Sequence, residues 1–233
     1  MRVKVVLSMM LAGLMAMASA PVAAQEKPKV AIPNAGVPEI MTIEGTFVRA
    51  AYNNEGYVIL GYETSNRSVG EPWMLLDVGM TVLDRTPNYT LRREALSLTT
   101  PDGATIQLPS IEEHRKADTR AIQNRARVQR DSINYFPPSA SRPCGIVFFP
   151  ALTSRAMPRD DTELSSTRAC IGRLFFPIPG GIKYGQYFLN VKFEKSVIRV
   201  PFRILTQDEE KMLSKNYKDI RKQVQEAFSP KKK

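Results

Sequence analysis

Histidine supplies much of the acid–base catalysis and many of the zinc ligands in proteins, and this chain contains only one, His114. A zinc site needs three or four protein ligands, and a serine or cysteine nucleophile needs a base such as histidine. His114 lies beside Glu112, Glu113 and Arg115 at the start of a predicted helix, where we expect a solvated surface histidine. The sequence therefore predicts no catalytic residue, no metal site and no cofactor.

The acidic run at residues 160–163 is a second candidate for chemistry, because carboxylate oxygens are the ligands that calcium prefers. Its spacing does not match an EF-hand loop, and Arg155, Arg159 and Arg168 flank it, so we expect a solvated acidic loop. Glycoside hydrolysis needs two carboxylates at a set separation across a cleft. The sequence identifies no such pair, so a hydrolase of envelope carbohydrate stays open as an alternative with unidentified carboxylates.

The first 24 residues have the pattern of a secretory signal peptide. Arg2 and Lys4 precede an apolar run over residues 5–18, and residues 22–24 supply a cleavage site. The run is shorter than the roughly 20 apolar residues that span a bilayer. We therefore expect an exported protein, periplasmic or extracellular, with an extended lead-in over residues 25–39.

Cys144 and Cys170 are the only cysteines, and an exported chain meets an oxidising compartment. We predict that they form a disulfide, which would stabilise the fold by roughly 3 to 4 kcal/mol for a loop of this length. The Cys-x-x-Cys spacing of redox proteins is absent. Each cysteine leads into a segment that ends Phe-Phe-Pro. We interpret this similarity between the two segments as coincidence. A disulfide at equivalent ends of two strands would nevertheless place those strands side by side.

The charge is moderately basic, with a formal net charge of +10, or about +8 once the two basic residues of the leader are removed. Such an excess suits anionic partners, but it is spread along the chain, so we expect no nucleic acid. Residues 229–233 form a basic tail whose three lysines are fewer than the four to eight of a lipid-binding cluster. An anionic surface is therefore a weakly supported partner.

Residues 40–206 are dominated by the period-two alternation of β-strands. In the clearest strand, Trp73 to Leu83, every second residue is apolar. A further strand is predicted at residues 57–63. Its first residues are apolar on both faces, which predicts a central position in the sheet. A proline and a glycine at residues 101–103 predict a hairpin turn. Pro201 cannot donate to a strand ladder, so its strand is predicted to be an edge or to carry a bulge.

Two helices interrupt or close this pattern. Ser110 with Glu113 forms a capping-box signature that opens a polar helix inserted at about residues 110–130, which we expect to be exposed or to dock by a narrow stripe. Thr206 with Glu209 opens a second helix, residues 207–228. Its apolar seam, a candidate site for docking on a partner or on the protein's own domain, consists of Leu213, Tyr217, Ile220, Val224 and Phe228.

The order of the strands resembles a known family. The segments 74–82, 96–103, 175–179 and 185–191 are similar to the strands and hairpin of telokin-like, immunoglobulin-type domains of exported bacterial proteins. The resemblance covers about residues 57–204 and implies architecture and an interaction role, since these motifs encode strands and turns. The inserted helix and the disulfide loop depart from the family pattern.

Together these observations predict a mostly β protein, an immunoglobulin-like antiparallel β-sandwich with an inserted polar helix and a C-terminal amphipathic helix. The leading functional hypothesis is a non-enzymatic exported binding or scaffold module whose partner is another envelope protein. It would serve as an accessory subunit of an envelope or membrane-associated assembly.

Overall fold

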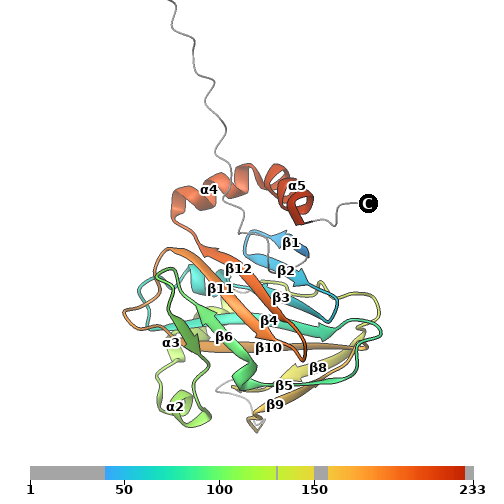
Figure 1. Ribbon diagram of the computed structural model, residues 1–233. Coiled ribbons are helices and arrows are strands. Elements are labelled where there is room, and N and C mark those ends of the chain that lie inside the picture. The colour runs from blue at the N-terminus through green and yellow to red at the C-terminus, as the bar shows by residue number, and fades with distance from the viewer. Residues whose placement is uncertain (1–39, 130, 150–156, 229–233) are drawn as a thin grey trace, which may run out of the picture. The chain divides into compact units, whose positions relative to one another are not determined.

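The computed structural model describes residues 40–129, 131–149 and 157–228, all within one compact unit that spans residues 32–233. The predicted signal peptide, the lead-in and the basic tail lie outside the described residues, as does Arg155. The chain is mostly β, which confirms the predicted fold class (Figure 1).

The largest sheet has six strands, and its central members are buried on both faces. In spatial order its strands are β1 (Ile40–Gly45), β2 (Val48–Tyr52), β3 (Gly56–Gly61), β4 (Trp73–Val82), β10 (Arg168–Pro177) and β8 (Arg142–Ile146). The strand predicted to be central, β3, lies between β2 and β4. All pairs are antiparallel except β8 with β10, a parallel pair that the prediction of an antiparallel fold did not include.

A four-stranded sheet carries the hairpin predicted at residues 101–103. Its strands are β12 (Val197–Ile204), β11 (Gly185–Lys192), β6 (Leu96–Thr99) and β7 (Thr105–Gln107). β6 and β7 turn through Gly103, whose φ of +86° favours glycine. β12 is an edge strand, as Pro201 predicted. A short ladder of β5 (Tyr89–Arg92) with β9 (Asp161–Leu164) completes the sheets.

The main hydrophobic core joins the inward rows of both large sheets. Every second residue of β4 from Met74 to Val82 belongs to it, together with Leu189 of β11 and Val200 of β12. A second, smaller cluster lies on the other face of the six-stranded sheet, where Ile133 and Phe136 pack on Ile59. The segment 131–136 therefore covers the outer face of β3 and β4 and accounts for their burial on both sides.

The predicted insertion is two helices rather than one, α2 (Ile111–Lys116) and α3 (Arg120–Val128). The predicted capping box is present, with Ser110 and Glu113 each bonded to the other's backbone amide. The chain is extended at Ala117, where ψ is 141°, and this breaks the helix. α3 docks by a narrow stripe, as expected for so polar a segment, and buries only Ile122, Gln123 and Ala126.

The C-terminal helix is likewise divided, into α4 (Gln207–Lys215) and α5 (Tyr217–Phe228), with a break at Asn216. The Thr206 capping box is confirmed. Short helices α1 (Glu63–Asn66) and η1 (Arg93–Ala95) complete the list. Within the described part of the chain, every helix is too short or too polar to cross a membrane.

Candidate functional site

A polar pocket of about 270 Å³ lies beside the disulfide, where the β5–β9 ladder meets the start of β8 and of β10. Each residue that lines it has a charged, amide or hydroxyl side chain; they are Asn88, Arg142, Glu163, Ser165, Ser166, Thr167 and Arg168. A lining of this kind can bind a polar or charged ligand through hydrogen bonds, but it has no apolar side chain against which an apolar ligand could pack.

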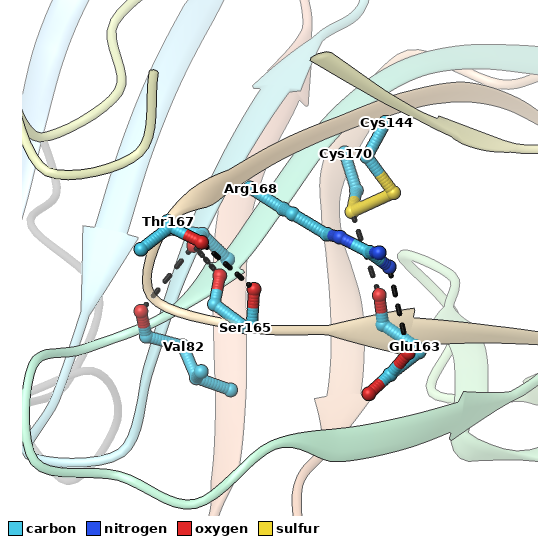
Figure 2. The surroundings of a disulfide bond; sticks show 8 residues. Val82, Cys144, Glu163, Ser165, Thr167, Arg168 and Cys170 are labelled. Carbon is cyan, nitrogen blue, oxygen red and sulfur yellow. Dashed lines mark hydrogen bonds and ion pairs between the residues drawn. A yellow bond between two sulfur atoms is a disulfide. The ribbon is translucent and has the colours of Figure 1, made fainter. Parts of the chain in front are cut away.

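The charges of the pocket are partly paired. The carboxylate of Glu163 accepts a hydrogen bond of 3.0 Å from the side-chain amide of Asn88. It also lies 3.5 Å from the guanidinium of Arg168 (Figure 2). Arg142 is exposed and has no ion pair within the described residues. The lining contains two guanidinium groups and one carboxylate, which gives the pocket a net positive charge.

The disulfide holds the strand that carries Arg142. Cys144 of β8 and Cys170 of β10 are bonded, with their Cα atoms 4.1 Å apart, which confirms the predicted pairing. They are direct partners in the parallel ladder, so the disulfide links equivalent positions of two neighbouring strands. The Sγ of Cys170 also lies 3.8 Å from the carbonyl oxygen of Glu163, one of the residues that line the pocket (Figure 2).

The hydroxyl-bearing turn between β9 and β10 is fixed by backbone contacts. The amide of Arg168 donates to the carbonyl of Ser165 at 3.0 Å, and the amide of Arg142 donates to the carbonyl of Thr167 at 2.9 Å. The hydroxyl groups of Ser165 and Thr167 lie 3.3 Å apart. The turn is thus held by the strands on both sides, and its hydroxyls face one another at the pocket.

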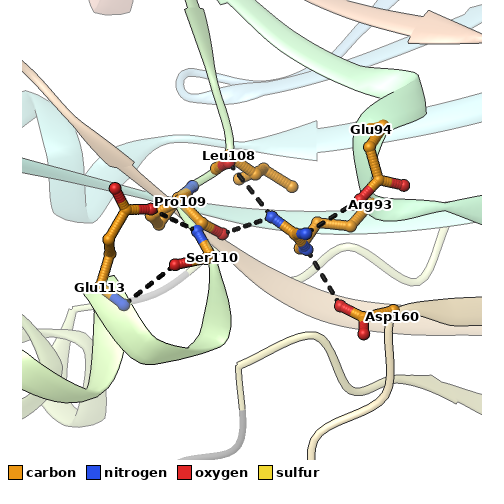
Figure 3. Close-up of polar contacts among 7 residues, drawn as sticks. All are labelled: Arg93, Glu94, Leu108, Pro109, Ser110, Glu113 and Asp160. Atoms are coloured by element: carbon orange, nitrogen blue, oxygen red, sulfur yellow. Dashed lines mark hydrogen bonds and ion pairs between the residues drawn. The ribbon is translucent and has the colours of Figure 1, made fainter.

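Arg93 anchors the far end of the β5–β9 ladder. Its side chain pairs with Asp160 at 3.1 Å (Figure 3). Its backbone amide also donates to the Asp160 carbonyl at 2.9 Å. The same guanidinium donates to the Pro109 carbonyl at 2.7 Å, just before the Ser110 cap of α2. Arg93 therefore connects the residue before β9 with the segment before α2, and in this way it helps to position Glu163 of β9.

The acidic run does not form the loop that we predicted. Asp161 and Glu163 belong to β9, where they alternate with the buried Thr162 and Leu164, because the apolar and hydroxyl side chains of this run are spaced for a strand. Asp160 is bound to Arg93. Within the described ranges, no group of three or more histidine, cysteine or acidic side chains is placed to hold a metal ion.

The expectation of a solvated His114 was wrong. Its ring lies 4.5 Å from Phe149, 4.8 Å from Phe175 and 6.3 Å from Trp73, measured between centroids. Its Nε2 is buried and has no hydrogen-bond partner in the described part of the structure. This burial lowers the pKa of His114. His114 therefore packs as an aromatic side chain. The sequence around His114 could not predict this, because the neighbouring rings come from β10 and from residue 149.

The seam of the C-terminal helix is buried against its own domain. α5 packs on β1, with α4 and α5 beside the N-terminal edge of the large sheet (Figure 1). Arg221 pairs with Glu44 of β1 at 3.1 Å, and Tyr217 donates to the Ile43 carbonyl at 3.3 Å. The seam residues all join or pack against the main core; they are Leu213, Tyr217, Ile220, Val224 and Phe228.

The sequence did not lead us to predict the pocket, although the acidic run and Arg168, which flanks it, were considered as a candidate calcium site. One further signal for the pocket was present. An arginine stands two residues before each cysteine, in Arg142-Pro143-Cys144 and in Arg168-Ala169-Cys170. The similarity between the two Cys…Phe-Phe-Pro segments, which we interpreted as coincidence, therefore extends to the residues before the cysteines. Because the strands are parallel and in register, it brings the two arginines together.

Comparisons with known proteins give no relative from which a role could be transferred. No family model matches the chain, and no curated protein or solved structure matches it. The function must therefore be argued from the site itself.

Proposed function

We propose that this protein is a non-enzymatic, exported binding or scaffold module whose partner is another envelope protein. It would serve as an accessory subunit of an envelope or membrane-associated assembly. Export rests on the signal-peptide pattern of residues 1–24 and is supported by the disulfide, since such bonds persist in oxidising compartments. The telokin-like, immunoglobulin-type relationship, which rests on the strand and turn motifs, is part of the same proposal.

The observation that carries the proposal is the state of the one carboxylate in the pocket. Glu163 accepts a hydrogen bond from Asn88 and pairs with Arg168, so both of its carboxylate oxygens already have partners within the protein. A general acid–base residue must reach its substrate's proton. The sole histidine is enclosed by aromatic rings. The pocket is therefore better suited to holding a ligand than to transforming one.

The alternative of a carbohydrate hydrolase would need a second carboxylate across the cleft. Glu163 is the only carboxylate among the residues that line this pocket. No observation in the described residues favours the hydrolase over the binding module.

Affinity capture tests the proposed function. The tagged full-length protein is recovered from the detergent-solubilised envelope of its host after cross-linking, and a strain with the tag on an unrelated exported protein serves as control. We expect one envelope protein to be enriched in a fixed ratio. Recovery of the protein alone, together with release of reducing sugar from envelope polysaccharide, would overturn the proposal in favour of the hydrolase.

A further inference from the structure

Two arginines from neighbouring strands line the pocket side by side. Arg142 of β8 and Arg168 of β10 are direct partners in the parallel ladder, two residues before the bonded cysteines. Partners across a ladder project on the same face of the sheet. Two like charges on neighbouring strands repel each other, so a counter-charge stabilises the arrangement.

Glu163 provides half of that counter-charge. It pairs with Arg168 at 3.5 Å and accepts a hydrogen bond from Asn88, while Arg142 has no acidic partner within the described residues. Ser166 and Thr167 add hydroxyl groups to the same lining. One guanidinium and several hydroxyl donors are therefore left for a further anion.

We propose that this pocket binds a carboxylate on an acidic segment of the protein partner, with Arg142 as the principal contact. The inference rests on the proposed function and names the chemistry by which the partner is recognised. A guanidinium binds a carboxylate through two parallel hydrogen bonds, and the hydroxyls of the turn can donate to the same oxygens.

The charge of the pocket favours a carboxylate over a phosphate. Arg142 and Arg168 with Glu163 give a net charge of one positive unit, which a single carboxylate neutralises. A phosphate dianion would leave the pocket negative and would lie close to Glu163. The basic net charge of the whole chain also favours association with an acidic segment.

The direct test is titration of the full-length protein with a short polyglutamate peptide, followed by calorimetry and by amide shifts in the NMR spectrum. We expect the largest shifts at residues 165–168. Arg142→Gln should weaken the affinity about fivefold, the magnitude of one exposed charge pair. Glu163→Gln should strengthen it, because the variant removes the competing carboxylate and frees Arg168.

Matched variants separate the pocket from general charge effects. Arg127→Gln removes one exposed arginine of α3, and Glu226→Gln removes one exposed carboxylate of α5, both outside the pocket lining. We expect both to leave the affinity within about twofold of wild type, because neither residue lines the pocket and exposed charges are screened by salt. Equal effects of Arg127→Gln and Arg142→Gln would overturn the site. Tighter binding of inorganic phosphate than of the peptide, with shifts at the same residues, would overturn the carboxylate as ligand.

Repeating the affinity capture with Arg142→Gln distinguishes this inference from the proposed function. Loss of the partner with the variant supports both. An undiminished yield of partner would leave the binding module standing and would overturn the role of the pocket. Peptide binding at the pocket without any captured envelope protein would support the pocket and contradict the proposed function.

Discussion

The buried hydroxyl of Thr81 in β4 donates a hydrogen bond of 2.9 Å to the carbonyl of Ser165, 84 residues further along the chain. Thr81 lies at the end of a strand that is buried on both faces, whereas Ser165 lies in the turn that lines the pocket. This contact connects the rigid centre of the large sheet directly to the candidate site.

Replacing Thr81 with valine keeps the side-chain shape and removes the donor. We expect Thr81→Val to lower the free energy of unfolding by about 1 to 2 kcal/mol, because the Ser165 carbonyl loses a buried partner. Thr90→Val, at an exposed position of β5, is the control and should change stability by less than about 0.5 kcal/mol. Urea denaturation measures both. Equal values would show that the contact contributes little.

The disulfide closes a loop between residues 26 positions apart. Reduction should lower the free energy of unfolding by roughly 3 to 4 kcal/mol, because the unfolded chain regains conformational freedom. Denaturation with and without reductant measures the loss, and a Cys144→Ala, Cys170→Ala double variant should be insensitive to reductant. In protein recovered without reduction, mass spectrometry after alkylation should find neither cysteine modified. Two free thiols would contradict the pairing and weaken the proposal of export.

The C-terminal helices should contribute to the stability of the domain. Ile220 is 9% exposed and belongs to the main core, so Ile220→Ala should cost about 2 to 3 kcal/mol through lost burial and the cavity that it leaves. Lys222→Ala changes a side chain of α5 that is 77% exposed, and its thermal midpoint should match wild type. If Ile220→Ala left the midpoint unchanged, α5 would not be part of the fold in solution.

Asp131 should make the protein more stable as the pH falls. Burial raises its pKa from an ordinary 3.8 to about 6, although the Glu63 amide donates to the carboxylate at 2.9 Å and opposes the shift. The folded state then takes up the proton more readily than the unfolded state, so the free energy of unfolding increases as the pH is lowered through 6. Asp131→Asn should be more stable than wild type at pH 7 and should lose this gain. An unaltered pH dependence would rule out Asp131 as its source.

His114 should act in the opposite direction. Because burial lowers its pKa below the ordinary 6.5, the unfolded state binds the proton more readily, and stability is lost as the pH falls below about 6.5. His114→Phe keeps a ring among Phe149 and Phe175 and cannot titrate. Thermal denaturation between pH 7.5 and 5, within the usual range for histidine titration, should show a smaller destabilisation for the variant. A larger one would contradict the burial of a neutral ring.

The elements that are specified locally could be predicted from the sequence. Both capping boxes, the Gly103 turn and the edge position of β12 follow from backbone chemistry at single residues, and structure and sequence agree on them. The disulfide could also be predicted, because only two cysteines were available. Two helices were predicted too long, because continuous periodicity conceals a break at a single residue such as Asn216.

What the sequence by itself determined, then, is the mostly β class, the caps and turns, and the cysteine pair. The environment of His114 and the pocket were decided only by the tertiary structure, because each depends on residues far apart in the chain. The register of β8 with β10 places Arg142 beside Arg168. The β5–β9 ladder adds Glu163, and Asn88, the residue before β5, bonds to it. Period-two patterns fix which face a side chain occupies, but they do not determine which strand lies next to it.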